Sequence, residues 1–364
     1  MDAKVTKKRL GEYLSYEWVK VVAFAIAIMI VWSLVFSVTS TKLTADQLFT
    51  VFNYMGTTVG TDFNNYSSLL LNKNTLSYEV YEISTVDVTV QDGSMSGSLL
   101  DTRMMTSEGD VMFAADSAYE GQYRYRLDEN GAFIPKKDAG GNPVLEENGE
   151  QAYETETSTY LYEFLTSKYY GAVMPLEDVT ADFGYGKQTM EGILTVTGRY
   201  LSKYFVKSGD FFNEAPMDEA KLEEDFRARV AETGDKRFRN ESLIQSGIGQ
   251  EKERLQQYRE AYNSFVQNLK EGKITATEST LVLETDSGEP LIVKGKFSIN
   301  LNPAGQMNAL QSSVFYHKKD ENDKDVKTTE DINLIFLNLT DSREEFVAEK
   351  LMFVDFLMDR YYGK

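Results

Sequence analysis

Residues 76–116, LSYEVYEISTVDVTVQDGSMSGSLLDTRMMTSEGDVMFAAD, decide the fold. Residues 76–90 are rich in β-branched and aromatic side chains that alternate with polar ones, which predicts a strand. Residues 98–106 then predict a helix, and residues 111–115 predict a short buried strand. A strand, a helix and a second strand are typical of a parallel sheet, because parallel strands need a crossover connection. We therefore expect an α/β (or α+β) domain.

The end of this stretch, residues 107–116, resembles a passage of the type II extracytoplasmic (periplasmic) solute-binding proteins, in which a Gly-Asp loop joins a helix to an apolar strand and an aspartate. Farther on, residues 159–169 predict a helix and precede residues 174–177, MPLE, which are similar to a Pro-Leu passage of that family. The resemblance implies two α/β lobes with a ligand cleft between them. The chain departs from the family in a turn-rich passage and in a polar, helical insertion.

Polar residues follow both predicted strands, and they are Asp92, Ser94, Asp116 and Ser117. Ligands of open α/β sheets bind outside the carboxyl ends of the strands, so these residues are the candidate ligand-binding site. Their short side chains could orient a sugar, an amino acid or a peptide group. Asp and Ser are also common helix N-caps, so the alternative is that they cap the helix that follows each strand.

The middle of the domain divides into two passages of different composition. Residues 119–155 contain turn signals at 128–131 and 139–143, which predict hairpins. The tyrosines of this passage suit a recognition surface, or they simply reflect β-propensity. Residues 216–272 are dense in charge and helical.

The helical passage is expected to contain two helices, interrupted at Gly234 and Gly247, with the second over residues 251–270. Glu251 and Arg254 lie on neighbouring turns of that second helix. Its apolar stripe should pack on the domain, and the stripe consists of Leu255, Tyr258, Tyr262, Phe265 and Leu269. A coiled-coil partner is the alternative, but the stripe is short for it.

The C-terminal part predicts three further strands and a final helix. Residues 280–285 and 291–301 read as a hairpin, and residues 331–339 as an apolar strand. Residues 343–361 close the chain as an amphipathic helix that should be tied into the core.

The N-terminal part contains residues 21–38, VVAFAIAIMIVWSLVFSV, which carry no charge and would make a helix of about 27 Å. We expect an uncleaved transmembrane anchor, although a secretory signal is the alternative. The preceding tail, residues 1–20, holds most of the nearby Lys and Arg residues, so the N-terminus should be cytoplasmic. An aromatic and basic belt at the membrane interface would consist of Tyr13, Tyr16, Trp18 and Lys20.

Residues 39–75 link the anchor to the domain over 76–364. Thr44 and Gln47 have the spacing of a capping box, so an amphipathic helix is expected to follow them. That helix would dock a partner or the bilayer surface, or it would pack on the domain's own core. Residues 63–71 predict a second helix.

Composition limits the classes of function. After the five basic and three acidic residues of positions 1–20 are set aside, 33 basic and 54 acidic residues remain, which disfavours nucleic acid as a partner. The chain has no cysteine, which points to a bacterial cell envelope, and a single histidine, His317, which we expect at the surface. Metal sites and catalytic triads are therefore disfavoured, and we expect no cofactor.

Three functions remain open. The first is a membrane-anchored, non-enzymatic binding module, such as a solute-binding or accessory subunit of an envelope transporter, with a permease as its partner. The second is a structural or interaction protein of the envelope that uses a degenerate solute-binding fold. The third is a carboxylate-based hydrolase, for which no pair of acids stands out among the 57.

Overall fold

The computed structural model describes residues 7–39, 47–56, 76–88, 96–182, 186–214, 216–284, 290–310, 318–319, 325–326, 332–338 and 344–364. The chain forms two compact units, Met1–Thr44 and Ala45–Lys364. Ala45–Lys364 is one unit, so the expected division into two lobes is not confirmed. The predicted helix over 63–71, as well as Asp92, Ser94 and His317, lies outside the described residues.

The first unit contains one helix, α1 (Lys7–Thr39). Within the described residues, α1 alone is long and apolar enough to cross a membrane, over Trp18–Val35. The predicted apolar helix is thus present, and its composition fits a membrane anchor or a signal sequence. Trp18 and Lys20 are exposed on it, and Tyr13 and Tyr16 belong to its first half.

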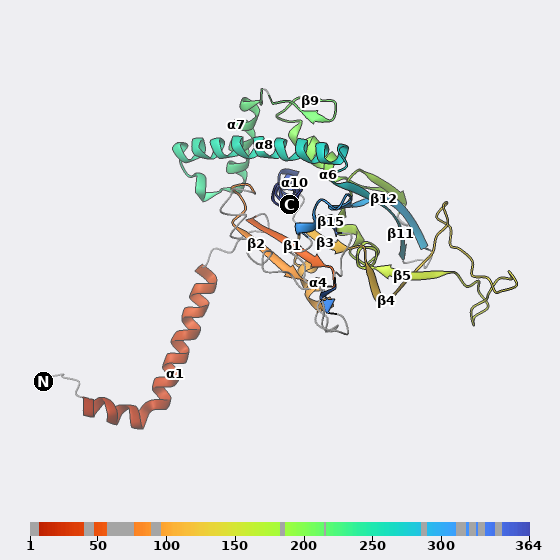
Figure 1. The fold of residues 1–364 in the computed structure, drawn as a ribbon. Helices are drawn as coiled ribbons and strands as arrows, with labels where there is room; N and C mark the ends of the chain where they lie inside the picture. The colour runs from red at the N-terminus through yellow and green to blue at the C-terminus, as the bar shows by residue number, and fades with distance from the viewer. Residues whose placement is uncertain are drawn as a thin grey trace. The chain divides into compact units, whose positions relative to one another are not determined.

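The second unit is built on a mixed sheet of seven strands (Figure 1). The strand order is β11 (Thr275–Glu284), β12 (Pro290–Asn300), β15 (Ile332–Leu337), β3 (Val111–Ala115), β1 (Leu48–Tyr54) and β2 (Glu82–Asp87), with β6 (Val173–Met174) also on β15. Strands β2, β1 and β3 are parallel, whereas the pairings of β3 with β15, β15 with β12, and β12 with β11 are antiparallel. The predicted parallel β-α-β unit is confirmed, but β1 lies between its two strands.

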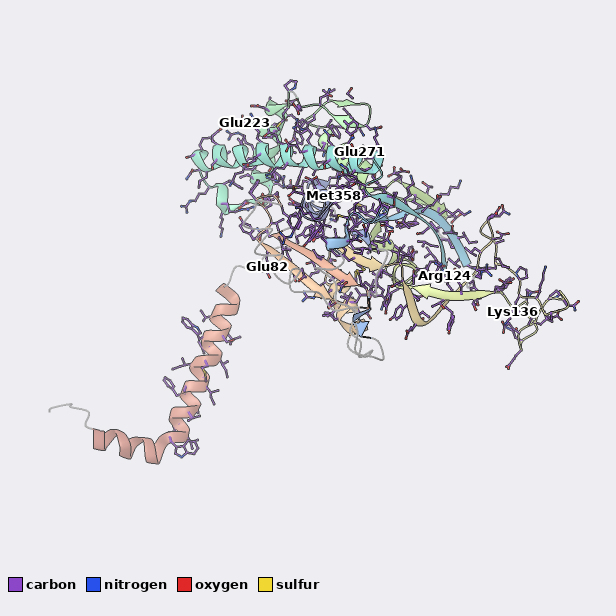
Figure 2. The ribbon with its side chains drawn as sticks, viewed as in Figure 1. Glu82, Arg124, Lys136, Glu223, Glu271 and Met358 are labelled. Atoms are coloured by element: carbon purple, nitrogen blue, oxygen red, sulfur yellow. The ribbon has the colours of Figure 1, made fainter. Side chains whose placement is uncertain are left out.

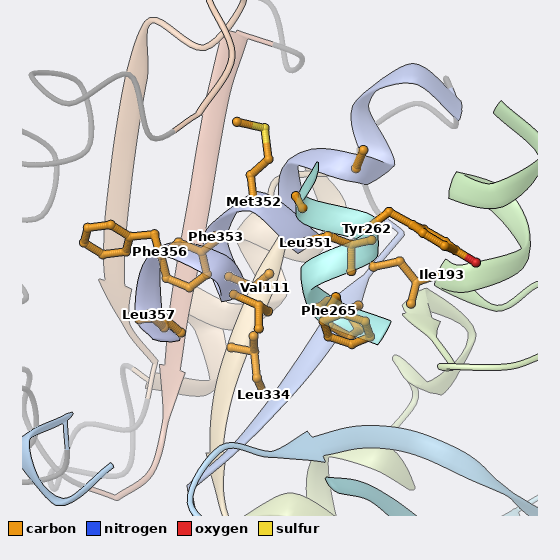
Figure 3. Close-up of a cluster of buried hydrophobic side chains, with 14 of the residues drawn as sticks. Val111, Ile193, Tyr262, Phe265, Leu334, Leu351, Met352, Phe353, Phe356 and Leu357 are labelled. Carbon is orange, nitrogen blue, oxygen red and sulfur yellow. The ribbon is translucent and has the colours of Figure 1, made fainter. Parts of the chain in front are cut away.

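Helices cover both faces of the sheet, which explains why β3 and β15 are buried along their whole length. One face packs against α6 (Ile193–Leu201), α8 (Glu241–Lys270) and α10 (Glu344–Tyr361). Figure 3 shows Leu351 and Phe353 of α10 against Val111 and Leu334 of the sheet. The other face packs against α4 (Ser96–Met105) and α5 (Tyr160–Leu165).

The predicted juxtamembrane helix is wrong over residues 48–54, which form strand β1 at the centre of the parallel part of the sheet. Phe49 and Val51 face one core cluster and Phe52 faces the other, so burial on both faces overrides the helical spacing. The predicted strand over 76–90 is also shorter than expected. Only Glu82–Asp87 pairs with β1, and residues 76–81 lead into that strand.

The Gly-Asp loop at residues 109–110, which resembles a passage of the solute-binding proteins, has a structural role in this fold. Asp110 Oδ2 accepts a hydrogen bond of 2.8 Å from the Thr50 backbone N–H, and Asp110 Oδ1 lies 3.4 Å from Lys350 Nζ. This buried pair joins β1, the start of β3 and α10, so it fixes the register of the sheet and the position of its covering helix.

The predicted hairpins over 119–155 are present. Strands β4 (Ala118–Tyr125) and β5 (Thr155–Thr159) pair and carry residues 126–154, which we call the arm (Figure 1). In the arm, the Arg126 N–H donates to Glu154 O, the Ile134 N–H to Arg126 O, and the Glu154 N–H to Ile134 O. A second ring of the same kind joins Lys136, Val144 and Ala152. The arm is therefore three short hairpins closed by two three-way backbone junctions.

The helical passage consists of α7 (Glu219–Thr233), the short turn η3 (Lys236–Phe238) and α8. Gly234 ends α7 in the left-handed conformation, as a C-cap glycine should. The predicted break at Gly247 is wrong, because α8 runs through it and begins at Glu241. Gly247 is instead buried where α8 meets α7 and η3: an added Cβ would lie 2.5 Å from Phe238 Cε1.

The C-terminal predictions hold: the hairpin is formed by β11 and β12, the apolar strand by β15 and the final helix by α10. Three further pairs of short strands lie outside the main sheet in the described residues: β7 (Val179–Asp182) with β8 (Lys187–Met190), β9 (Lys207–Ser208) with β10 (Phe211–Phe212), and β13 (Lys318–Lys319) with β14 (Asp325–Val326). One further turn of 3-10 helix is η2 (Tyr170–Ala172).

Candidate ligand-binding site

Asp116 and Ser117 directly follow β3, as predicted, at the carboxyl end of a parallel strand. The next element is strand β4 and not a helix, so neither residue is an N-cap there. The helix that follows, α5, is capped by Thr159, whose side chain accepts from the Tyr162 N–H. The capping alternative is therefore wrong for Asp116 and Ser117.

Asp116 lines a cavity of about 320 Å³ at this edge of the sheet. The base of the arm contributes Arg124 and Glu156, whose Nε and Oε1 atoms lie 2.7 Å apart. The Arg124 guanidinium lies 4.7 Å from the centre of the Tyr162 ring, so the cation is held by both a carboxylate and an aromatic face. Figure 2 shows Arg124 where the arm begins and Lys136 farther along it.

Two carboxylates of this cavity, which we call the smaller cavity, are unpaired. Asp116 and Glu278 are exposed and make no hydrogen bond or ion pair with any residue of the described ranges. Ser117 is not part of the lining, and its carbonyl accepts a hydrogen bond from the Tyr160 N–H. The lining combines four charged side chains with tyrosine, leucine and hydroxyl groups, so the cavity suits a compact polar group.

A larger cavity, of about 700 Å³, lies in the helical layer and was not predicted. Its walls come from the end of α6 and one face of α7, with one residue each from α8 and α10. Ligand cavities in proteins usually measure about 300–1,000 Å³, so its volume suits a small molecule. The lining combines aromatic groups with charges of both signs, among them Tyr200, Tyr204, Asp225, Phe226, Arg229 and Glu251.

Tyr200 is the most informative residue of the larger cavity. Its side chain is only 4% exposed, yet its hydroxyl forms no hydrogen bond within the described part of the chain. The ring itself is fixed by edge contacts with Tyr204 and Tyr258, at centroid distances of 5.7 and 6.4 Å. Burial raises the pKa of Tyr200, so the hydroxyl stays protonated and can both donate and accept.

The inner end of the cavity rests on five charged residues that we call the ion cluster: Glu79, Arg229, Arg237, Glu251 and Arg254. Glu251 pairs with Arg254 and lies 3.2 Å from Arg229 Nη2. Glu79 lies 3.0 Å from Arg237 Nη1 and 3.8 Å from Arg229 Nη2. The two acids and three bases thus form one continuous network between residues 76–81 and the helices.

The electrostatics of the buried acids differ. Burial alone would raise the pKa of Glu251, but Arg254 and Arg229 outweigh it, and the pKa is lowered. Burial prevails at Glu349 of α10, whose pKa is raised although Tyr258 donates to it at 2.6 Å and the Ser77 N–H at 3.1 Å. The anionic form of Glu251 is therefore stabilised relative to an exposed glutamate, whereas that of Glu349 is destabilised.

The sequence contained part of the signal for this site. Glu251 and Arg254 precede the apolar stripe of α8 at the same helical spacing, so their burial could have been expected. The contribution of residues 76–81 could not have been expected, because the sequence predicts that Tyr78 lies in a strand. In the structure, the Tyr78 hydroxyl donates a hydrogen bond of 2.9 Å to Glu251 Oε2.

No protein-family model, curated protein or solved structure matches this chain. Within the described ranges, no group of three or more histidine or acidic side chains could hold a metal ion.

Proposed function

We propose that this protein is a membrane-anchored, non-enzymatic binding module of a bacterial cell envelope. In this proposal α1 crosses the membrane with its N-terminus in the cytoplasm, and Ala45–Lys364 lies outside and holds a small molecule. A transporter permease is the expected partner, which the module would serve as a solute-binding or accessory subunit. The apolar length of α1 and the Lys and Arg residues before it support the topology.

One observation carries the binding function: the larger cavity is lined by a tyrosine whose ring is buried and whose hydroxyl has no hydrogen-bond partner in the described part of the chain. This hydroxyl is not one of the fully buried side-chain atoms that lack a partner, so it is open to water or to a ligand. A ligand atom that bonds to the Tyr200 hydroxyl would take the place of water there. The ion cluster behind it holds the wall in place before a ligand arrives.

The test uses the full chain in detergent micelles. Thermal unfolding is measured with a panel of amino acids, dipeptides, sugars and small amines, and each compound that stabilises the protein is followed by calorimetry. Tyr200→Phe should weaken the binding of such a compound about tenfold, because the hydrogen bond between the ligand and the Tyr200 hydroxyl is lost.

The matched control is Tyr125→Phe, which removes a hydroxyl from the smaller cavity. It should leave the same binding unchanged. If no compound stabilises the protein, or if both variants bind equally well, the larger cavity is not the ligand site.

A second function, that of an envelope interaction protein, is favoured by the arm. Tyr123, Tyr125 and Tyr153 expose large aromatic surface at its base, and Leu145 does so within it. A photo-crosslinking residue at position 145 tests this function in intact cells. A single abundant adduct that does not form when the same residue is placed at the exposed Leu243 of α8 would support it, and the absence of an adduct at position 145 would count against it.

A further inference from the structure

The cationic side chains that line the larger cavity have ion-pair partners, whereas one of its acidic side chains has none among the described residues. This difference points to the class of ligand. The inference rests on the proposed binding function. Each cation of the lining has a carboxylate partner: Lys221 Nζ lies 2.9 Å from Asp225 Oδ1, and Arg229 has both Glu251 and Glu345 within 3.6 Å. Lys203 is held by Glu344 at 3.0 Å. No cation of the lining is left to neutralise an anionic ligand.

One acid of the lining is in the opposite situation. Glu232 makes no hydrogen bond or ion pair with any residue that the structure describes. It belongs to a stripe of α7 in which Lys221, Asp225, Ala228 and Glu232 recur at helical spacing and line one wall. The small side chain of Ala228 leaves room beside Glu232.

Other residues of the lining offer different chemistry. Leu222 and Phe226 of α7 present apolar surface, and Tyr200 of α6 presents its unpaired hydroxyl. A ligand that fits both ends has a positive group for Glu232, an apolar body and a second polar group for Tyr200. The negative net charge of the chain, −19, also favours the approach of cations.

We propose that the larger cavity binds a small organic cation, with an amine or guanidinium group at Glu232 and a hydrogen-bonding group at the Tyr200 hydroxyl. The aliphatic chain between these groups lies along Leu222 and Phe226. Basic amino acids and short diamines belong to this class.

The experiment compares three linear probes of matched length: 1,5-diaminopentane, 1,5-pentanediol and glutarate, which carry two positive charges, none and two negative charges. Binding to the full chain in non-ionic micelles is measured by calorimetry at low salt. The diamine should bind about tenfold more tightly than the diol, and glutarate should bind most weakly.

Two isosteric variants locate the charge effect. Glu232→Gln should weaken diamine binding about fivefold to tenfold, because it removes the carboxylate at the ligand. Glu224→Gln makes the same change of net charge on the same helix but outside the lining, and it should leave the affinity within about twofold.

The outcomes separate this inference from the proposed function. The cation class is wrong if glutarate or the diol binds as tightly as the diamine, if the two Gln variants behave alike, or if the diamine does not bind. The binding function survives those results when a compound of another class binds in a way that depends on Tyr200. It fails with the inference when Tyr200→Phe affects no compound.

Discussion

The guanidinium of Arg254 shows how this protein stabilises a fully buried charge. Its Nη2 bonds to Glu251, but its Nε and Nη1 atoms have no hydrogen-bond partner in the described residues. Three rings surround it instead, with the guanidinium carbon 5.4 Å from the centre of Tyr258, 5.6 Å from that of Phe346 and 5.9 Å from that of Tyr78. Cation–π attraction, worth about 2 kcal/mol where water is excluded, therefore replaces some of the missing hydrogen bonds.

The two buried tyrosines of this region should respond differently to loss of their hydroxyls. Tyr258→Phe removes the hydrogen bond to Glu349 and should lower the free energy of unfolding by about 1–3 kcal/mol. Tyr200→Phe removes a hydroxyl without such a bond and should change it by less than about 0.5 kcal/mol. Urea denaturation of the full chain measures both, and equal losses would mean that the Tyr200 hydroxyl has a partner.

Glu349 should make stability depend on pH in a predictable direction. Its pKa is raised in the folded state above the ordinary value of 4.5. In the pH window between 4.5 and the pKa of the folded state, the folded protein therefore binds more protons than the unfolded one. The free energy of unfolding therefore falls as pH rises through the window. Gln cannot titrate, so the stability of Glu349→Gln relative to the unaltered protein should increase as pH rises from about 4.5.

Urea denaturation at several pH values checks this, with Glu129→Gln in the arm as the control for a lost charge. A constant difference between Glu349→Gln and the unaltered protein across the window would contradict the prediction.

At the scale of helices and strands, the sequence predicted the elements in which the local pattern of apolar residues agrees with their burial in the fold. Val111–Ala115, Ile332–Leu337 and Glu344–Tyr361 each have an apolar pattern that the core uses directly. Leu48–Tyr54 could not be recognised, because its phenylalanines lie at helical spacing and only burial between β2 and β3 makes them strand residues.

The candidate site could be predicted only in part, for a related reason. Asp116 was found because a strand end is a local feature, and it does line a cavity. The lining of the larger cavity combines residues of α6 and α7 with one residue each from α8 and α10, a tertiary arrangement that no single segment encodes.

The glycines of α8 offer a matched pair of substitutions. Gly247→Ala should destabilise the protein by about 1–3 kcal/mol, because its Cβ would overlap Phe226 and Phe238. Gly249 has no atom within 4 Å of an added Cβ, so Gly249→Ala should stabilise the protein by up to about 1 kcal/mol through helix propensity. Chemical denaturation measures both, and stabilisation by Gly247→Ala would show that this contact is looser than the structure has it.

For the whole molecule, the compact unit Ala45–Lys364 should fold without α1. Expressed alone, it should be soluble, show a mixed helix and strand circular dichroism spectrum and unfold cooperatively. A reductant should not change its melting temperature, because the chain has no cysteine. Aggregation, or the spectrum of a random coil, would show that the unit needs the N-terminal helix.

The proposed topology has its own test. Protease added to intact protoplasts should digest the second unit and leave a fragment that contains α1, while a cytoplasmic marker protein stays whole. The intact mass of the membrane-bound chain should equal that of a chain that begins at Met1. Protection of the full-length protein would reverse the orientation, and a shortened N-terminus would indicate a cleaved signal sequence.

The position of β1 in the sheet also governs how the protein can be synthesised. The ribosome releases β1 early, but the other neighbour of β3 is β15, and the helix over that face is α10 near the end of the chain. Until residues 332–361 emerge, β3 lacks one of its two neighbouring strands and one of the helices that cover it, a state prone to aggregation. A premature stop codon before position 332 would therefore leave a product unable to complete its sheet.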